Sequence, residues 1–512
     1  MSPTVNAHDD GVLIAPNDAH NARLVANVHP RDWKNPVAKD RYHVVVIGAG
    51  TAGLVTASAA AGLGAKVALI ERHLMGGDCL NVGCVPSKGV IAPARAWEAA
   101  RRAGADFHGP NASGAGNFAA VMERMRRLRA DISVVDGAPR YASLGVDVFL
   151  GDGRFTGPDA IEVGGQTLRF RRAVIATGAR AAAPPIPGLA GTPYLTNETV
   201  FALTDLPPRF LVIGGGPIGC EMAQSFARFG SEVTLIDRSA QILPREDADA
   251  AAVVQAGMER SGVRFRFSAG IEAVSHANGV FSVTIERGGR REVLVGDQLL
   301  VAIGRAPNVD GLGLERAGIA FEKTGVTVDD RFCTSQANVY AIGDVASKYQ
   351  FTHAADFMAR YVVQNALFFG RKKGSRLVIP WATYTTPELA HVGHTEASAQ
   401  AAGIPVTTIT IPFHDVDRAR LDGQEEGFVR VHVRTGTDRI EGATIVAEHA
   451  GDLLGEFTLC MTHGLGLGAI GSTIHPYPTQ GEALRKAADA LNRTKLTPTI
   501  KRLFATWFRL FT

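Results

Sequence analysis

The sequence has few cysteines and no long apolar run. Five of its 512 residues are cysteine, too few for a disulfide scaffold, and no run of 18 or more apolar residues is present to form a spanning helix. Lys and Arg number 53 against 50 Asp and Glu, so no charge excess indicates a nucleic-acid-binding protein. The first 40 residues lack the apolar segment of a secretory signal, so we expect a cytoplasmic protein.

The length and the glycine content are informative. A chain of 512 residues is long enough for about three domains, and its hydrophobic fraction of 46% can fill more than one core. Its 57 glycines show no G-X-Y period, which excludes collagen. Such an excess is typical of tight turns and of backbone that approaches a ligand closely.

One segment of the sequence is repeated. Residues 42–72 and 209–238 align without a gap at an offset of 166, and each contains a β-branched run, a G-x-G-x-x-G turn, a helical stretch and a strand ending in an acid. This pattern predicts a dinucleotide-binding βαβ unit, in which glycines let the backbone approach a pyrophosphate at a helix N-terminus. The glycines of the two turns are Gly48, Gly50, Gly53, Gly214, Gly216 and Gly219. Two such units predict two bound dinucleotides.

The acid at the end of each copy bears on which dinucleotide binds. Glu71 is followed by Arg72, and Asp237 by Arg238. A carboxylate here accepts a hydrogen bond from a ribose 2′-hydroxyl and repels a 2′-phosphate. The second unit is therefore predicted to prefer NADH, although Arg238 beside the acid would favour NADPH.

Cys79 and Cys84 follow the first unit closely. Five residues along a regular helix would separate their Cα atoms by roughly 8–9 Å, beyond the ~7 Å limit of a disulfide, so a bridge requires distorted backbone between them. A helical stretch is predicted over Pro93–Arg102, and a thiolate near a helix N-terminus has a lowered pKa. Zinc is not expected, because no His or further Cys lies at zinc spacing. Two interpretations of Cys79 and Cys84 remain: they are inert core residues, or they form a redox-active pair. The adjacent dinucleotide unit favours the redox-active pair.

The segment GGDCLNVGCVPSK, with GAGTAG before it and GGGPIG after it, resembles the FAD-dependent pyridine nucleotide–disulfide oxidoreductases over about residues 42–492. Further matches to this family lie at 176–178, 303–308, 340–344 and 385–393. The resemblance implies an α/β fold with two Rossmann-like dinucleotide-binding domains, for FAD and NAD(P), and a C-terminal α/β dimerisation domain. It also implies a homodimer.

The same resemblance implies a mechanism. Electrons would pass from NAD(P)H through FAD to a Cys79–Cys84 disulfide, and then to a small-molecule disulfide or metal-ion acceptor. Cys84 would be the flavin-proximal thiolate, and Cys79 the thiol that attacks the substrate. Lys88 would lie near the flavin and pair with Glu221. The other implied cofactor-binding residues are Gly77, Gly153, Ala176, Thr177, Gly178, Gly304, Asp344 and His353.

The C-terminal segment departs from the family's disulfide reductases, which carry His-Pro-Thr-x-x-Glu with the histidine as acid/base. Aligning Pro-Thr-x-x-Glu places Tyr477 in the acid/base position and Glu482 in that of its orienting partner. A second register places His475 there, with Gln480 in place of the glutamate. The first register is the better match. In the implied dimer, Tyr477 or His475 would face Cys79 of the other subunit.

A tyrosine in this position resembles the mercuric reductases of the family. A phenol with a pKa near 10 is a poor base at neutral pH, which argues against efficient lipoamide turnover. The sequence ends at Thr512 without the C-terminal cysteine pair of mercuric reductases, so we expect a mercuric-reductase-like member whose acceptor can differ. Dihydrolipoamide dehydrogenase and a membrane-surface redox sensor of low turnover remain as alternatives.

The motifs suggest a division of the chain. We expect an N-terminal arm over 1–40, an FAD-binding domain over 41–190 and 306–375, an NAD(P)-binding domain over 191–305, an interface domain over 376–492 and an amphipathic tail over 493–512. Apolar residues of the tail fall at 500, 503, 504, 507, 508 and 511. Such a helix either docks on its own protein or a second subunit, or makes peripheral contact with a membrane. Docking on protein is the expectation that we favour.

Overall fold

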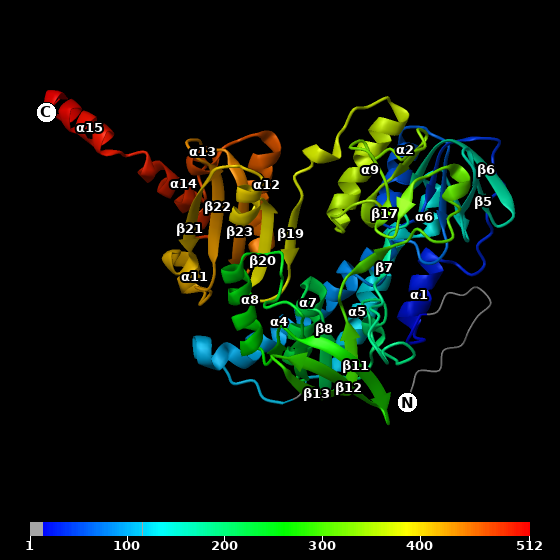
Figure 1. The fold of residues 1–512 in the computed structure, drawn as a ribbon, viewed down its shortest axis with the longest axis horizontal. Helices are drawn as coiled ribbons and strands as arrows, with labels where there is room; N and C mark the ends of the chain where they lie inside the picture. The colour runs from blue at the N-terminus through cyan, green and yellow to red at the C-terminus, as the bar shows by residue number, and fades with distance from the viewer. Residues whose placement is uncertain (1–13, 115, 512) are drawn as a thin grey trace. The chain divides into compact units, whose positions relative to one another are not determined.

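The computed structural model describes residues 14–114 and 116–511, and its elements are labelled in Figure 1. The chain forms two compact units. The first comprises Met1–Arg101, Ala112–Arg238 and Ser268–Leu377, and the second Arg102–Asn111, Ser239–Phe267 and Val378–Thr512. The predicted α/β class is confirmed. The predicted boundaries of the FAD-binding and NAD(P)-binding domains remain predictions, because both regions fall largely within the first unit.

A seven-stranded sheet in the first unit has the strand order β3-β2-β1-β6-β5-β4, with β18 beside β6. Its strands are β1 Tyr42–Ile47, β2 Val67–Glu71, β3 Val146–Leu150, β4 Arg154–Gly157, β5 Ala160–Val163, β6 Gln166–Ile175 and β18 Val339–Ala341. Strand β1 pairs in parallel with both β2 and β6. Its valines are buried, as expected for a parallel strand covered on both faces. Helix α2, Thr51–Gly62, connects β1 to β2 and completes the first βαβ unit.

The second copy of the repeat forms the same unit. Strand β8 (Arg209–Ile213) is followed by α7 (Pro217–Phe229) and β9 (Glu232–Ile236), and β8 pairs in parallel with β9. Strand β14, Gln298–Val301, pairs in parallel with the other edge of β8. An antiparallel meander lies between β9 and β14 in the chain: β11 Gly270–Ala277, β12 Val280–Arg287 and β13 Arg290–Gly296.

The described part of the N-terminal arm packs against the first unit. Helix α1 (Ala19–Val28) buries Leu24, Val25 and Val28, and lies beside α5 (Phe118–Ile132). Further along the chain, the Trp33 indole donates a hydrogen bond to the carbonyl oxygen of Val148 at 3.1 Å. The arm is thus a surface wrap from residue 14 onward, and its first 13 residues lie outside the described part of the chain.

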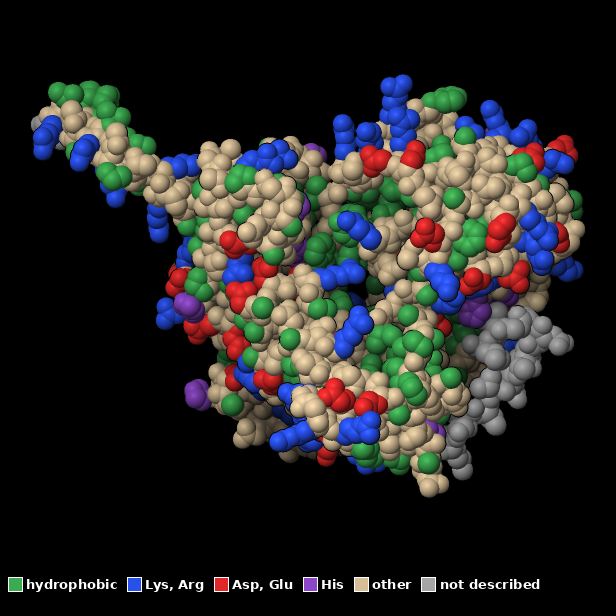
Figure 2. All heavy atoms as spheres, in the orientation of Figure 1, with side chains coloured by type: hydrophobic (Ala, Val, Ile, Leu, Met, Phe, Trp, Pro, Cys, Tyr) green, Lys and Arg blue, Asp and Glu red, His purple; other side chains and the backbone are tan. Residues whose placement is uncertain are grey.

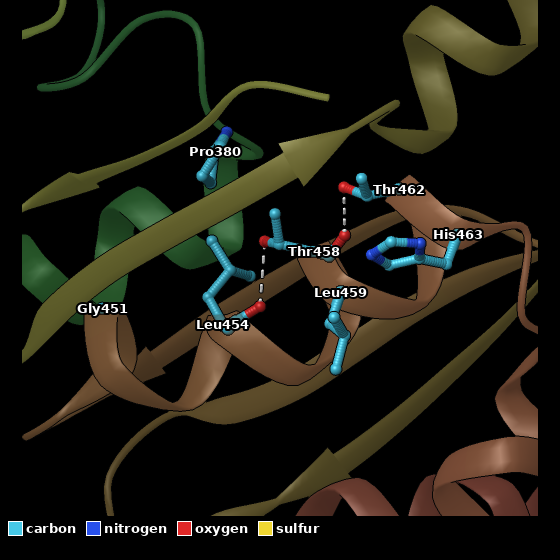
Figure 3. Close-up of a pocket in the computed structure, with 8 residues that line it drawn as sticks. Pro380, Gly451, Leu454, Thr458, Leu459, Thr462 and His463 are labelled. Atoms are coloured by element: carbon cyan, nitrogen blue, oxygen red, sulfur yellow. Dashed lines mark hydrogen bonds between the residues drawn. The ribbon is translucent and has the colours of Figure 1, made fainter. Parts of the chain in front are cut away.

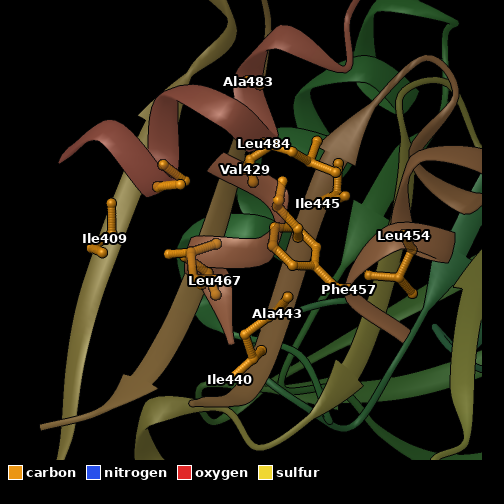
Figure 4. Packing of buried hydrophobic residues seen from close by; sticks show 14 of the residues in the cluster. Ile409, Val429, Ile440, Ala443, Ile445, Leu454, Phe457, Leu467, Ala483 and Leu484 are labelled. Atoms are coloured by element: carbon orange, nitrogen blue, oxygen red, sulfur yellow. The ribbon is translucent and has the colours of Figure 1, made fainter. Parts of the chain in front are cut away.

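The second unit is built on an antiparallel sheet with the order β19-β20-β23-β22-β21. The strands are β19 Pro380–Thr383, β20 Glu388–Gly393, β21 Val406–Pro412, β22 Phe428–Arg434 and β23 Ile440–Ala447. Figure 4 shows Phe457 and Leu484 packed against Val429 and Ile445 of the sheet. They belong to α12 (Ala450–His463) and α14 (Glu482–Thr494), with α13 (Leu467–Ser472) between them in the chain. This core anchors both ends of the segment that carries His475 and Tyr477.

The predicted amphipathic tail is helix α15, Pro498–Phe511. We expected this helix to dock on protein, but none of its residues is buried in this chain. The residues before it, 492–497, are exposed, so this link does not pack the helix against the sheet core. Within the described residues, no helix is long and apolar enough to span a membrane.

Candidate active site

Cys79 and Cys84 lie on two consecutive helices with a break between them. Helix α3 is a short turn over Gly77–Asn81, and α4 runs over Cys84–Phe107 with Cys84 as its first residue. At the break, a Cβ on Gly83 would lie 2.7 Å from the Asp78 carbonyl oxygen. The backbone is thus distorted between the cysteines, which are both free thiols in this structure. Helix α4 begins nine residues before the predicted start at Pro93, and that proline lies inside the helix.

The two thiols have opposite pKa shifts. A hydrogen bond from Cys79 is the largest contribution that lowers the pKa of Cys84 to about 5. Burial opposes the shift, while a hydrogen bond from Thr352 and the charge of Lys88 add to it. The same contact with the Cys84 sulfur, together with burial, raises the pKa of Cys79. At neutral pH, Cys84 is therefore a thiolate and Cys79 a neutral thiol.

Thr352 is a site residue that the sequence reasoning did not single out. Its Oγ1 lies 3.5 Å from Cys84 Sγ, and it is the first residue of α9, Thr352–Leu367. A hydrogen bond to an ionised sulfur is stronger than one to a neutral acceptor. The N-termini of α4 and α9 thus both adjoin the Cys84 sulfur, where their dipoles favour a negative charge. The only sequence signal was the family match at the neighbouring residues.

Lys88 and Glu221 form an ion pair, with the Lys88 Nζ 3.0 Å from Glu221 Oε2. Lys88 lies one turn after Cys84 on α4, and Glu221 lies on α7. The Glu221 side chain is 6% exposed and that of Lys88 38%. The structure therefore brings together two residues that the resemblance had paired, although they are 133 positions apart.

The first glycine turn has the form of a phosphate cradle. Gly48 has a φ of +100°, and a Cβ there would lie 2.4 Å from the carbonyl oxygen of Ala176. A Cβ on Gly53 would lie 1.8 Å from the Gly48 carbonyl oxygen. Helix α2 begins after Gly50, and no described side chain caps its first turn. Its first N–H groups can therefore bind an anion, so these residues fit a dinucleotide pyrophosphate.

The second glycine turn repeats this geometry. Gly214 has a φ of +111°, and a Cβ there would lie 2.4 Å from the Ala302 carbonyl oxygen. A Cβ on Gly219 would lie 1.9 Å from the Gly214 carbonyl oxygen. Helix α7 begins after Gly216, and again no described side chain caps its first turn. This turn also fits a dinucleotide.

The acid after each turn binds the backbone of its own turn. Glu71 Oε2 accepts a hydrogen bond from the Ala49 N–H at 2.7 Å, and burial raises the pKa of Glu71. Asp237 Oδ2 accepts from the Gly215 N–H at 2.6 Å. Each carboxylate therefore lies directly beside the place where the turn would hold a dinucleotide. The two following arginines, Arg72 and Arg238, are exposed.

An ionic network adjoins Cys79 and Cys84. Asp78, next to Cys79, forms an ion pair with Arg305, and the Arg305 Nε lies 3.3 Å from Asp344 Oδ2. Burial raises the pKa of Asp344, while Arg305 acts against that shift. Asp344 was predicted as a cofactor-binding residue, whereas Asp78 and Arg305 were not. Arg305 could have been found, because it lies inside the family match at 303–308.

The other predicted cofactor-binding residues lie at turns or at close backbone contacts. A Cβ on Gly77 would lie 2.6 Å from the Gly50 Cα, and one on Gly153 3.0 Å from the Ile70 side chain. Thr177 Oγ1 donates to the Asn308 carbonyl oxygen at 2.8 Å. Positive φ angles occur at Gly178, +66°, and Gly304, +136°. His353 is exposed, and its ring stacks on Phe351.

In the second unit, Tyr477 is 73% exposed. Its hydroxyl donates a hydrogen bond to Asp417 Oδ2 at 3.1 Å, and this hydrogen bond raises the pKa of Tyr477. Asp417 is the first residue of α11, Asp417–Leu421. Glu482, the predicted orienting partner, instead forms ion pairs on its own helix, with Arg485 at 3.5 Å and Lys486 at 3.4 Å.

His475 has an acceptor at each ring nitrogen. Its Nδ1 lies 3.0 Å from the Thr473 carbonyl oxygen, and its Nε2 lies 3.0 Å from Glu456 Oε2 on α12. His475 is thus tied to its own unit, and the sequence did not suggest Glu456 as its partner.

A pocket of about 340 Å³ lies on α12, beside Pro380 of β19. Figure 3 shows Leu454, Thr458, Leu459, Thr462 and His463 along its wall. Its side chains are mainly apolar and include neither a thiol nor a carboxylate. The described residues also contain no group of three or more His, Cys, Asp or Glu placed to hold a metal ion. The pocket is therefore not the centre of redox chemistry.

Comparison with known proteins identifies the family. Residues 42–359 match the pyridine nucleotide-disulphide oxidoreductases, and residues 379–488 match the dimerisation domain of that family. The chain belongs to this family of flavoprotein oxidoreductases, whose members bind FAD and a nicotinamide dinucleotide. The predicted family and fold are confirmed, and the dimerisation domain supports the predicted homodimer.

Individual relatives differ in activity. A mercuric reductase of Bacillus cereus is 34% identical over 87% of this chain and 71% of its own. A dihydrolipoyl dehydrogenase of Thermus scotoductus is 36% identical over 88% of this chain and 98% of its own. Among solved structures, the Cu(II) complex of the HOCl-induced flavoprotein disulfide reductase RclA from Escherichia coli has a TM-score of 0.78 at 29% identity, covering 88% of this chain and 100% of that one. These comparisons define the family but not the electron acceptor.

Proposed function

We propose that this flavoprotein passes electrons from NADH, through FAD and the Cys79–Cys84 pair, to a thiophilic metal ion. We choose this acceptor because of the residue in the acid/base position of the C-terminal segment. In the register that we favour, Tyr477 takes the acid/base position, and the pKa of this phenol is raised by its hydrogen bond to Asp417. The comparisons support the family, and the acceptor is our inference from this chemistry.

FAD would supply hydride acceptance from the nicotinamide and two-electron transfer to the cysteine pair. The Gly48–Gly53 turn and Glu71 would hold its diphosphate and ribose, with Asp344 and Lys88 as further contacts. The Gly214–Gly219 turn and Asp237 would hold the second dinucleotide. Because a carboxylate disfavours a 2′-phosphate, NADH is the preferred donor in this proposal.

The cysteine pair is organised for opposite roles. Cys84 is held as a thiolate by the hydrogen bonds of Cys79 and Thr352 and by the Lys88 charge. Cys79 keeps its proton until it is needed, because loss of that proton would place two negative sulfurs side by side. Cys79 would therefore be the thiol that meets the acceptor, while Cys84 carries the negative charge.

A disulfide acceptor needs a proton for each thiolate that it releases, and a positioned acid/base normally supplies it. Tyr477 is a weak acid in this position, and both His475 nitrogens are already engaged. A metal ion accepts electrons without such a proton transfer, and soft ions such as Hg(II) bind well to thiolates. The Cu(II) complex of the structural relative RclA is in line with a metal-ion acceptor.

The proposal is tested by anaerobic oxidation of NADH with Hg(II), Cu(II), lipoamide or glutathione disulfide as acceptor. We expect turnover with a metal ion, and its loss in Cys79→Ser. Because a positioned acid/base contributes about 10²–10⁴-fold, Tyr477→His should raise lipoamide turnover by at least about tenfold. His475→Asn is the matched control and should leave metal-ion turnover unchanged.

One pattern would contradict the proposal. If the unaltered protein turned over lipoamide faster than either metal ion, and His475→Asn abolished that activity, the histidine would be the acid/base and the metal-ion acceptor would be wrong. Dihydrolipoyl dehydrogenase activity would then be the better conclusion, in line with the 36% identical Thermus scotoductus relative.

A further inference from the structure

Helix α15, Pro498–Phe511, presents an apolar face that its own chain does not cover. Trp507 is 56% exposed and Phe511 67% exposed, and their rings lie 4.2 Å apart between centroids. Further exposed apolar side chains of the helix are Leu503, Phe504, Phe508 and Leu510. A helix this apolar is rarely left in water without a partner that covers it.

The apolar and cationic side chains of α15 are on opposite sides. At about 100° per residue, the apolar positions from 500 to 511 fall within an arc of about 160°. Lys501, Arg502 and Arg509 fall on the remaining arc, together with Ala505 and Thr506. Figure 2 shows the hydrophobic side chains of this segment gathered along one side and Lys and Arg along the other.

The charge of the segment has one sign. Residues 490–512 contain five basic side chains, of Arg493, Lys495, Lys501, Arg502 and Arg509, and no Asp or Glu. A second copy of this helix could cover the apolar face, but it would bring no acidic side chain to pair with these bases. An anionic lipid surface complements both features, since it takes up the aromatic face and attracts the bases at its edge.

From this geometry we propose that α15 is an interfacial anchor that lies in the plane of an anionic membrane. Fourteen helical residues extend only about 21 Å, less than the ~30 Å apolar thickness of a bilayer. The helix therefore lies in the interface and does not cross it. It follows α14 after a link of three residues, 495–497, so it would hold the second unit beside the lipid.

Flotation of the full chain with phosphatidylcholine vesicles, with and without phosphatidylserine, tests the anchor. We expect the protein to float only with phosphatidylserine. Each basic side chain near an anionic membrane contributes about 1 kcal/mol to binding. Replacing Lys501, Arg502 and Arg509 by glutamine should therefore weaken vesicle binding about a hundredfold. W507S/F511S should weaken it at least as much, whereas A505S on the cationic side is the matched control and should bind normally.

A chain ending at Thr494 keeps α14 complete and should lose flotation while retaining bound flavin and NADH oxidation. Analytical sedimentation of this shortened chain measures its oligomeric state. It tests the alternative that a second copy of the chain covers α15. Unchanged dimerisation together with lost flotation supports the anchor. If the full chain fails to float, or binds neutral and anionic vesicles equally, the proposal is wrong. Loss of the dimer in the shortened chain would instead show that α15 packs on a second copy.

Discussion

The hydrogen bond from Thr352 to Cys84 gives a prediction with a defined size. Thr352→Val replaces the hydroxyl by a methyl group of similar shape, so the hydrogen bond is lost with little change in packing. A hydrogen bond to a charged group contributes about 1.5 kcal/mol at the low end of the usual range, which corresponds to about one pKa unit. The 3.5 Å separation justifies the low end. The pKa of Cys84 should therefore rise from about 5 to about 6.

The assay is a pH titration of the reduced protein with FAD bound. The long-wavelength band between thiolate and flavin reports ionised Cys84, and it should be absent in Cys84→Ser. At about pH 5.5, the thiolate fraction should fall from about three quarters to about one quarter, a threefold loss of the band. Thr352→Ser keeps the hydroxyl and should titrate like the unaltered protein.

A second variant separates the effect of the Lys88 charge on the pKa of Cys84 from the effect of the Thr352 hydrogen bond. Lys88→Gln removes the positive charge that also lowers the pKa of Cys84, and this effect ranks below that of Thr352. The shift in Lys88→Gln should shrink at high salt, because salt screens the charge of the half-exposed lysine. An unchanged titration midpoint in Thr352→Val, or an equal shift in Thr352→Ser, would show that the Thr352 hydroxyl does not stabilise the Cys84 thiolate.

Three further predictions concern the cofactor turns and the second unit. Gly48→Ala would place a Cβ 2.4 Å from a carbonyl oxygen at a φ of +100°, so this variant should lose its bound flavin. Gly62→Ala, whose Cβ would meet nothing within 4 Å, is the control and should retain the flavin. Absorbance spectra of the purified proteins measure the bound flavin. Asp237→Ser removes the charge that opposes a 2′-phosphate and should raise the ratio of kcat/KM for NADPH over NADH by about tenfold; an unchanged ratio would count against the role of Asp237. Burial raises the pKa of Glu246 from 4.5 to about 7, so its stabilising effect is complete below about pH 4.5 and is lost as pH rises through about 7. Urea unfolding should show up to about 3 kcal/mol of this pH dependence, and Glu246→Gln should lack it; parallel profiles would contradict the assignment.

Much of the fold was predictable because its signals are local. The two βαβ units could be located from their glycine turns, since a positive φ and a close backbone approach leave room only for glycine. The cysteine pair could be selected because it follows the first unit directly. Even the need for distorted backbone between Cys79 and Cys84 followed from helix geometry, and the structure has that break at Gly83.

Other features depended on residues far apart in the chain. Thr352 is 268 positions from Cys84, and Glu456 is 19 positions from His475, so neither contact follows from local spacing. Helix α4 begins at Cys84, nine residues before the predicted Pro93, and contains that proline. Helix α15 is not buried against its own chain, and its docking on a second subunit stays a prediction, because amphipathicity specifies an apolar face but not the partner that covers it.

The sequence by itself thus determined the family and the two βαβ units and singled out the Cys79–Cys84 pair, because these depend on backbone geometry encoded by short motifs. The family resemblance already implied Cys84 as the thiolate, but only the tertiary structure shows what lowers its pKa, since that pKa depends on Cys79, Thr352 and Lys88 meeting around one sulfur. The tertiary structure also decided that both His475 nitrogens are engaged while Tyr477 faces solvent. Hydrogen bonds and desolvation act over a few ångströms in space, and the folded chain alone sets those distances.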